Sequence, residues 1–156
     1  GITLRYISGN PLTGIKIDEN GVLRAFHSQV TVIPEGKEVL EPLGWASLSP
    51  NRYSAGCMYP HLKPNPGKKY RLDARIKGGQ RAIIMSNEYD KVFPMDIFPE
   101  QLIKAIIAFN IDKMENLGIY EVAPEDFALC EFVDTSKLEL QKIVRTGLDM
   151  LYKEME

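Results

Sequence analysis

Two histidines are the residues of this sequence best suited to general acid–base chemistry. His27 and His61 are the only histidines among the 156 residues. Histidine titrates near neutral pH and is the most frequent general acid or base in proteins. His61 lies in "CMYPHLKP", close to Tyr59 and directly before a basic run. We therefore predict His27, His61 and Tyr59 as catalytic residues. The alternative is that His61 is a surface histidine and His27 a half-buried structural one.

The cations concentrate in one segment, although the formal net charge of the chain is only -2. Residues 63–81 carry seven Lys or Arg side chains against Asp73 alone. Alternate side chains on a strand lie about 7 Å apart on one face, which suits neighbouring phosphates. The predicted phosphate-binding residues are Lys63, Lys68, Lys69, Arg71, Arg75, Lys77 and Arg81. The alternative is that these cations form the solvated outer face of an antiparallel sheet.

A stretch rich in hydroxyl groups, "GWASLSPNRYSAG", lies N-terminal to the basic run. Trp45 and Tyr53 in it are predicted to bind substrate by stacking, whereas the alternative is that Trp45 packs the loop onto the core. The sequence contains no Gly-x-Ser-x-Gly elbow, no Gly-rich phosphate loop and no paired-histidine metal motif. We therefore predict chemistry that uses neither a metal nor a cofactor.

The first two-thirds of the chain show the patterns of strands and loops. Residues 2–7 read as a strand, and Asn20-Gly21 predicts a hairpin within residues 15–33. Residues 34–69 hold six prolines and four glycines, which predicts a long loop. Residues 70–86 alternate on both sides of Gly78-Gly79, which predicts a second hairpin that presents the cations.

The last third shows mainly helical patterns. Residues 98–118 predict one helix with Pro99 at its first position, and residues 136–156 predict another that begins at a Ser136 cap. The segments "IYEV" and "FALCEFV" between them are strand candidates. The predicted fold class is α+β, an antiparallel hairpin-rich sheet packed against two amphipathic helices. We expect a single domain over residues 1–156, excised from a longer protein because the chain starts at Gly1 without Met.

Composition excludes several classes of protein. With 44% hydrophobic and 26% charged residues, the chain is typical of a globular domain. No apolar run approaches the roughly 20 residues of a membrane span, so we expect a soluble protein with no membrane partner. Two cysteines, Cys57 and Cys130, make no disulfide framework, and Cys130 is predicted to be a buried thiol.

One segment resembles a known family of toxins. Residues 76–106, "IKGGQRAIIMSNEYDKVFPMDIFPEQLIKAI", are similar to part of bacterial EndoU-type ribonuclease toxins. There a Gly-Gly-His-Arg-like turn precedes Phe-Pro and a short helix, and here Gly78-Gly79-Gln80-Arg81 and Phe93-Pro94 stand in those places. Because Gln80 replaces the family's histidine, the resemblance assigns no catalytic residue.

The predicted function is metal-independent RNA cleavage by a bacterial toxin or effector domain. RNA or another phosphate-bearing ligand is the predicted substrate, a cognate inhibitor protein is a predicted partner, and secretion or delivery into a cytoplasm is the expected localisation. One alternative is a non-enzymatic binding module, an immunity or adaptor protein that uses the acidic residues 82–156. A further alternative is an NAD-dependent ADP-ribosyltransferase toxin. Arg5 and "SLS" at residues 47–49 loosely resemble the Arg and Ser-x-Ser motifs of that family, although this sequence lacks the family's Glu-x-Glu at the expected place.

Overall fold

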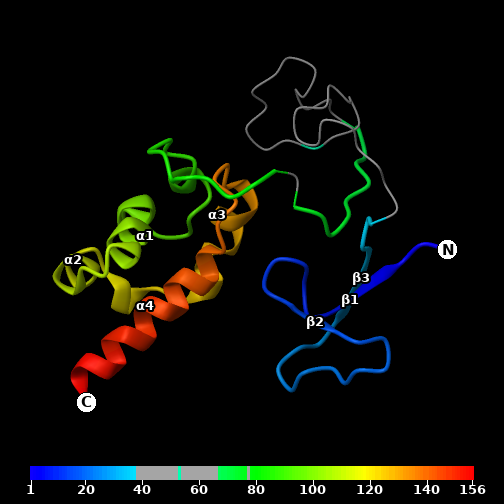
Figure 1. The fold of residues 1–156 in the computed structure, drawn as a ribbon, viewed down its shortest axis with the longest axis horizontal. Helices are drawn as coiled ribbons and strands as arrows, with labels where there is room; N and C mark the ends of the chain where they lie inside the picture. Colours follow the sequence, from blue (N-terminus) through cyan, green and yellow to red (C-terminus); the bar gives the residue numbers. More distant parts are fainter. Residues whose placement is uncertain (38–52, 54–66, 77) are drawn as a thin grey trace. The chain divides into compact units, whose positions relative to one another are not determined.

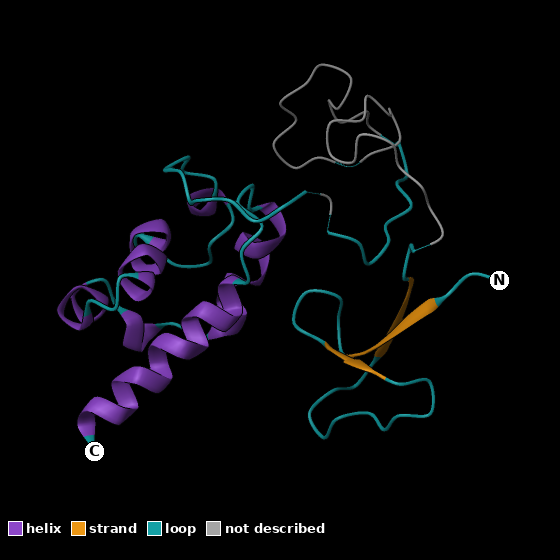
Figure 2. Ribbon diagram, viewed as in Figure 1, coloured by secondary structure: helices purple, strands orange, loops and turns teal. Residues whose placement is uncertain are grey.

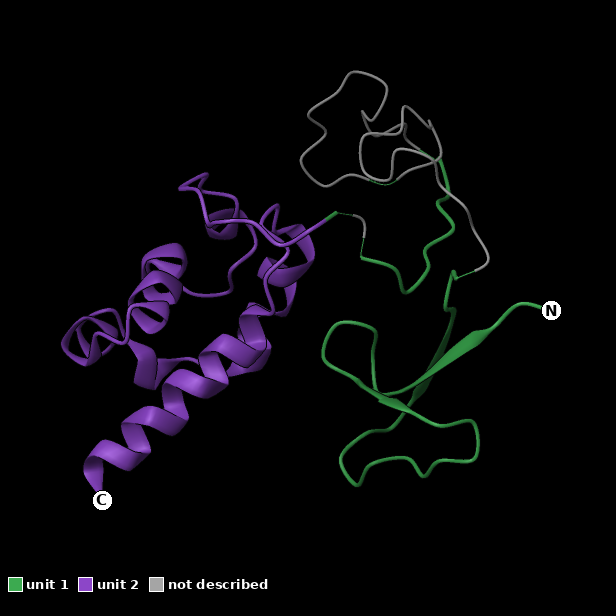
Figure 3. Cartoon of the chain, in the orientation of Figure 1, with its two compact units in different colours: residues 1–78 green, residues 79–156 purple. Residues whose placement is uncertain are grey.

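The computed structural model describes residues 1–37, 53, 67–76 and 78–156. These residues form two compact units, residues 1–78 (unit 1) and residues 79–156 (unit 2), which Figure 3 colours separately. The described chain is α+β, with a three-stranded antiparallel sheet and several helices, and the predicted fold class is therefore confirmed. The expectation of one domain over residues 1–156 stays a prediction.

The sheet of unit 1 has its first strand in the middle. The strands are β1 (Leu4–Ser8), β2 (Ile15–Ile17) and β3 (Val30–Pro34), in the order β2-β1-β3 (Figure 1). Both pairings are antiparallel, and Tyr6 lies opposite Ile17 on one side and Val32 on the other. All three strands fall where alternation of apolar residues predicted extended chain.

The predicted hairpin within residues 15–33 is wrong in its pairing. Gly21 does close a turn, since its N–H donates to the Asp18 carbonyl at 2.9 Å. The strand before this turn, however, pairs with β1 and not with the chain that follows. The actual hairpin is closed by residues 9–14, where the Asn10 side chain accepts from the N–H groups of Leu12 and Thr13. An asparagine that binds the backbone of the next residues in this way stabilises a turn without Asn-Gly.

Unit 2 contains four α-helices joined by short connections (Figure 2). Three 3-10 turns lie before or between them. The helices are α1 (Pro99–Ile107), α2 (Ile111–Asn116), α3 (Ala128–Val133) and α4 (Leu140–Met155). The turns are η3 (Tyr89–Lys91), η4 (Ile119–Glu121) and η5 (Pro124–Phe127).

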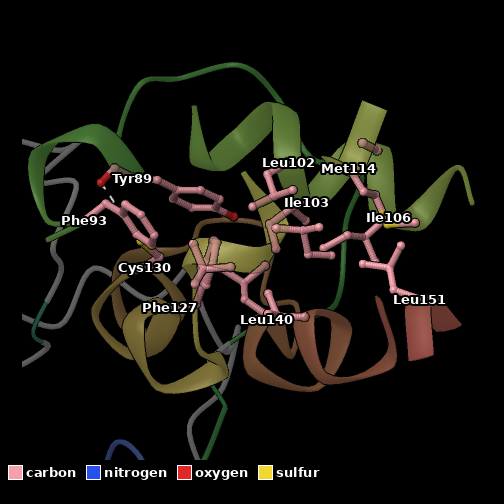
Figure 4. Packing of buried hydrophobic residues seen from close by; sticks show 14 residues of the cluster. Tyr89, Phe93, Leu102, Ile103, Ile106, Met114, Phe127, Cys130, Leu140 and Leu151 are labelled. Atoms are coloured by element: carbon pink, nitrogen blue, oxygen red, sulfur yellow. Dashed lines mark hydrogen bonds between the residues drawn. The ribbon is translucent and has the colours of Figure 1, made fainter. Parts of the chain in front are cut away.

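The core of unit 2 lies between α1 and α4, with side chains from the turns and from α3 (Figure 4). Leu102, Ile103 and Ile106 of α1 are buried against it. Gly147 of α4 allows the two helices to approach, because a Cβ at this position would lie 3.0 Å from Ile106 Cγ2. At such a distance the neighbouring side chain would have to move, so a glycine suits this position.

The predicted helix over residues 98–118 is two helices. Phe109 has a φ of 53°, a left-handed conformation that ends α1. Asn110 then begins α2, because its Oδ1 accepts from the Lys113 N–H at 3.0 Å. An asparagine at this position satisfies a donor of the first helical turn. The Asn110 cap therefore starts a second helix, although the apolar periodicity continues across both helices.

The strand candidates in unit 2 and the predicted start of the last helix are also wrong. "IYEV" contains η4, and "FALCEFV" spans the end of η5 and α3, whose buried side chains face the helical core. The last helix begins at Leu140 rather than after Ser136. Ser136 is instead used elsewhere, because its Oγ donates to the Ala82 carbonyl at 3.2 Å.

Candidate functional site

The basic run does not form the predicted hairpin. Residues 70–76 and 78–86 contain no strand, and the Gly78-Gly79 pair marks the division between the two units. The Ala74 N–H donates to the Pro34 carbonyl at 2.9 Å within unit 1. The Arg81 N–H donates to the Ser136 carbonyl, also at 2.9 Å, within unit 2. Each predicted arm therefore pairs with a different part of the chain, and the expected face of aligned cations is absent from these residues.

Arg75 binds a carboxylate of its own segment. Its Nη2 lies 2.6 Å from Asp73 Oδ2, and its Nε donates to Asp73 Oδ1 at 3.1 Å. The side chain also lies over Gly36, where a Cβ would approach Arg75 Nε to 2.7 Å and where φ is +79°. The charge predicted to bind phosphate is thus compensated by Asp73 and packed on the backbone after β3.

The remaining described cations of the run have other surroundings. Lys68 Nζ lies 5.1 Å from the centre of the Tyr70 ring, a cation–π distance. Tyr53 meets the same ring edge-on at 5.5 Å. Lys69, Arg71 and Arg81 are exposed. Outside the described residues lie Trp45, Tyr59, His61, Lys63 and Lys77.

His27 is held against the sheet. Its Nδ1 lies 2.8 Å from the Oγ of Ser8, a fully buried residue of β1. The same Oγ accepts from the Arg24 N–H at 3.1 Å. The Ser8 hydroxyl either donates to Nδ1 or accepts from it, according to the tautomer of His27. The histidine therefore fixes residues 24–27 onto β1.

Sequence patterns missed an ion pair between β1 and the residue that follows β3. Arg5 of β1 donates twice to Glu35, from Nε and from Nη2, each at 2.7 Å. Lys16 Nζ of β2 lies 3.8 Å from the same carboxylate. The hydrogen bonds from Arg5 lower the pKa of Glu35 from its ordinary 4.5 to about 2. No local pattern links Arg5 with Glu35, and only the register of β1 with β3 brings them together.

A buried carboxylate organises one end of unit 2. Asp134 Oδ1 accepts from the Tyr89 hydroxyl at 2.8 Å and from the Ser136 N–H at 2.9 Å. Asp134 Oδ2 accepts from the Leu138 N–H at 2.8 Å. Burial, and then the bond to Asp134, raises the pKa of the Tyr89 hydroxyl. These three hydrogen bonds fix the chain between α3 and α4, so Asp134 has a structural role.

Cys130 is a buried thiol, as predicted. Burial is the main cause that raises the pKa of its Sγ, to about 12. A thiol with such a pKa carries almost no thiolate near neutral pH, and thiolate is the reactive form. Cys130 therefore contributes to packing.

A second buried carboxylate, Glu100, lies in the first turn of α1. Its Oε1 accepts from the Ser86 N–H at 3.3 Å and from Ser86 Oγ at 3.4 Å. Its Oε2 has no hydrogen-bond partner among the residues that the structure describes. The positive end of a helix dipole favours a carboxylate at this position.

Metal ligands do not cluster in the described part of the chain. No group of three or more His, Cys, Asp and Glu side chains is placed to hold a metal ion there. In the same residues, no helix has the length and apolar character needed to cross a lipid bilayer.

The comparison with known proteins gives a consistent set of relatives. No protein-family model matches the sequence. The A subunit of the Na(+)-translocating NADH-quinone reductase of Hahella chejuensis is 35% identical over 152 residues, which cover 97% of this chain and 34% of the relative. The A subunit of the same enzyme from Neisseria meningitidis serogroup C is 35% identical over 96% of this chain and 33% of its own length. That of Rhodopirellula baltica is 34% identical over 98% and 33%. The chain thus spans about one third of the length of these relatives.

These relatives overturn the predicted function. Proteins similar over nearly the whole chain are subunits of a reductase, so the EndoU resemblance, the toxin or effector function and RNA cleavage are wrong. The predictions of RNA and of an inhibitor protein as partners are also wrong. The relatives give no support to the immunity, adaptor and ADP-ribosyltransferase alternatives. The reaction assigned to His27, His61 and Tyr59 is withdrawn with them. A ligand-binding role of the predicted site residues stays a prediction.

Proposed function

We propose that this chain is part of the A subunit of a Na(+)-translocating NADH-quinone reductase. The observation that carries the proposal is the similarity of 35% identity over 97% of the chain to a protein of that name. The matched length is too great to leave out either unit, so both units have counterparts in the relatives. The partners of this chain are then the remainder of its own polypeptide and the other subunits of the reductase.

Within that enzyme we propose that the chain contributes protein contacts. Glu35 and Asp73 pair with arginines, and Asp134 accepts three hydrogen bonds, all inside the units. Large apolar side chains, in contrast, remain exposed, among them Phe26 in unit 1 and Phe98 in unit 2. Exposed aromatic side chains are typical of surfaces that bind other protein surfaces.

Purification of the native polypeptide that carries this chain tests the proposal. The polypeptide is tagged in its own organism, extracted in mild detergent and purified, and its companions are identified by mass spectrometry. We expect the other reductase subunits to co-purify, together with NADH-quinone reductase activity that Na⁺ stimulates. A strain without the gene should lose this activity and regain it when the gene is restored. A polypeptide that purifies alone, or an activity indifferent to loss of the gene, would overturn the proposal.

A further inference from the structure

The connection between β2 and β3 exposes two large apolar side chains that lie four residues apart in the sequence. Phe26 is fully exposed, and the exposed fraction of Val22 is 85%. In Figure 1 this connection, residues 18–29, forms the long loop between β2 and β3 of unit 1. A fully exposed phenylalanine leaves about 200 Å² of mostly apolar surface in water, which is unfavourable for an isolated protein.

The segment that carries Phe26 is nevertheless well defined. The N–H of Arg24 and the Nδ1 of His27 both bind Ser8 Oγ, and the His27 N–H donates to the Arg24 carbonyl at 3.0 Å. Phe26 lies between these two fixed residues. A side chain presented by a segment already held in one conformation loses little entropy when it binds a partner.

One face of the sheet exposes further apolar side chains. Residues directly opposite in antiparallel strands point to the same face, so Ser8, Ile15 and Val30 share a face. Leu4 and Val32 lie on that face as well, through alternation along β1 and β3. The four apolar side chains of this group are each more than one third exposed, namely those of Leu4, Ile15, Val30 and Val32. The docking surface defined here consists of Leu4, Ile15, Val22, Phe26, Val30 and Val32.

The opposite face of the sheet is already covered. Ile7 is buried there, and a Cβ on Gly14 would lie 2.5 Å from Ile7 Cγ2, so residues 9–14 pack onto this side chain. Arg5 projects to the same face and binds Glu35. Unit 1 has therefore folded its own loops over one face. On the other face, residues 24–27 cover Ser8 and leave the apolar side chains around it exposed.

We propose that the docking surface binds the part of the A-subunit polypeptide that lies outside the matched third. This inference rests on the proposed function. The relatives are about three times as long as the alignment, so two thirds of such a polypeptide remains to supply an apolar counterpart.

The size of the docking surface favours an occupant in the same polypeptide. Its exposed side-chain area is on the order of 600 Å², taking about 200 Å² for a fully exposed phenylalanine. Stable complexes of separate proteins bury about 800 Å² per partner. With an equal counterpart such a surface would bury about 1,200 Å² over both sides, which lies within the roughly 600–1,500 Å² of interfaces between domains of one chain and only at the lower limit of the about 1,200–2,000 Å² of separate proteins. Covalent connection supplies an effective concentration near the millimolar range, which compensates for a small area.

Hydroxyl-radical footprinting with mass spectrometry tests the proposal without changing the sequence. The oxidation rate of Phe26 is measured in three samples: the isolated 156-residue chain, the complete polypeptide that carries it, and the assembled reductase. We expect rapid oxidation in the isolated chain, and a several-fold slower rate in the complete polypeptide that assembly does not lower further. Phe93 in the core of unit 2 provides a protected reference of the same residue type in every sample.

The alternatives give different results. Protection that appears only in the assembled reductase would assign the surface to a different subunit, which would overturn the proposal. Protection that rises with the concentration of the isolated chain would assign it to a second copy, with the same consequence. Equal, rapid oxidation in all samples would show that nothing binds there. A complete polypeptide that protects Phe26 but fails to purify with reductase subunits would contradict the proposed function alone.

A matched pair of variants sharpens the test. Phe26→Asp places a charge in the docking surface but at a fully exposed position, so the isolated chain should keep the helix signal and thermal melting of the wild type. In the complete polypeptide, the same variant should restore rapid oxidation of peptides that contain β1 and β3. Glu19→Gln, at an exposed position of the same connection, should leave the footprint as in wild type. A footprint unaffected by Phe26→Asp would also overturn the proposal.

Discussion

The two units of this protein are stabilised in different ways. Unit 2 buries a continuous set of apolar side chains between α1 and α4, with Phe127 and Phe93 in contact at 4.7 Å between ring centres. In the described residues of unit 1, Ile7 alone belongs to the buried apolar side chains, and polar contacts join the segments. Arg5 with Glu35, Ser8 with His27 and Arg75 with Asp73 are the main ones.

This difference indicates what each unit requires from its surroundings. Burial of apolar area is the dominant favourable contribution to folding, so unit 2 carries much of its own stability. Polar contacts are specific but contribute modestly in net free energy. Unit 1 also leaves apolar side chains exposed on one sheet face. We therefore expect changes in the core to have the largest effects in unit 2, and changes in backbone packing or charge to matter most in unit 1.

A charge in the core of unit 2 should have the largest effect. Ile106→Asp places a carboxylate at a position that is 2% exposed. Without a partner it should lower the free energy of unfolding by more than about 4 kcal/mol. Far-UV circular dichroism should show the loss of helix. Ile107→Asp, one residue later but 47% exposed, should change stability by about 1 kcal/mol at most. Native melting of Ile106→Asp would disprove the core assignment.

A single methyl group on Gly14 should disrupt unit 1 selectively. The Cβ of an alanine would lie 2.3 Å from the Asn10 carbonyl oxygen and 2.7 Å from that of Ser8. Backbone atoms cannot move aside easily, so we expect a loss of about 3 kcal/mol, the upper end of overpacking costs. Urea unfolding followed by the backbone NMR signals of β1 measures it.

Gly79→Ala is the control for this change. No atom lies within 4 Å of its added methyl group, and its φ is not positive. Its effect should stay within about 0.5 kcal/mol. Equal effects of Gly14→Ala and Gly79→Ala would contradict the packing of residues 9–14 on β1.

Removal of one hydroxyl should weaken unit 2 by an intermediate amount. Tyr89→Phe deletes the donor to Asp134 Oδ1 and leaves the two backbone donors. A hydrogen bond to a charged group is worth about 1.5 kcal/mol at the low end of its range, which is the loss we expect. Thermal melting of the helical signal provides the measurement. Tyr120→Phe removes an exposed bond to Glu115 and should leave the melting temperature unchanged. A larger effect of Tyr120→Phe would reverse our assignment of the two hydroxyls.

Acid should weaken unit 1 gradually and by the smallest amount, because solvent screens an ion pair whose arginine side chain is 31% exposed. Folding lowers the pKa of Glu35 from 4.5 to about 2. This lowered pKa stabilises the folded state at pH values above about 4.5. The stabilisation is lost as the pH falls from about 4.5 to 2. Urea midpoints from the NMR signals of β1 should therefore fall over this interval. Glu35→Gln should flatten that part of the profile, and an unchanged profile would show that the pair with Arg5 contributes nothing.

Local patterns predicted the elements of both units better than their contacts. Alternation placed β1 and β3, and Pro99 marked the first residue of α1. The same reasoning extended α1 through Phe109, because an apolar period continues past a residue whose left-handed backbone ends the helix. It assigned Ser136 to a helix cap, because spacing alone does not reveal that its hydroxyl binds the Ala82 carbonyl.

The candidate site was less predictable than the fold. The charges between residues 63 and 81 are visible in the sequence, but the carboxylate that binds Arg75 is two residues away and competes with any ligand. His27 was singled out for its chemistry, whereas its described contacts place it in a structural role beside Ser8. Arg5 and Glu35 were not paired because no short-range pattern joins positions 30 residues apart.

The sequence by itself determined the α+β class, the positions of β1, β2 and β3, and the apolar stripes of α1 and α4. These depend on periodicity and on residues such as Pro99 that act within one turn of chain. Only the tertiary structure decided that β1 lies between β2 and β3, and that residues 70–76 and 78–86 pair with separate units. A backbone donor binds whichever acceptor the whole fold brings within reach, and distant segments compete for it on equal terms with near ones.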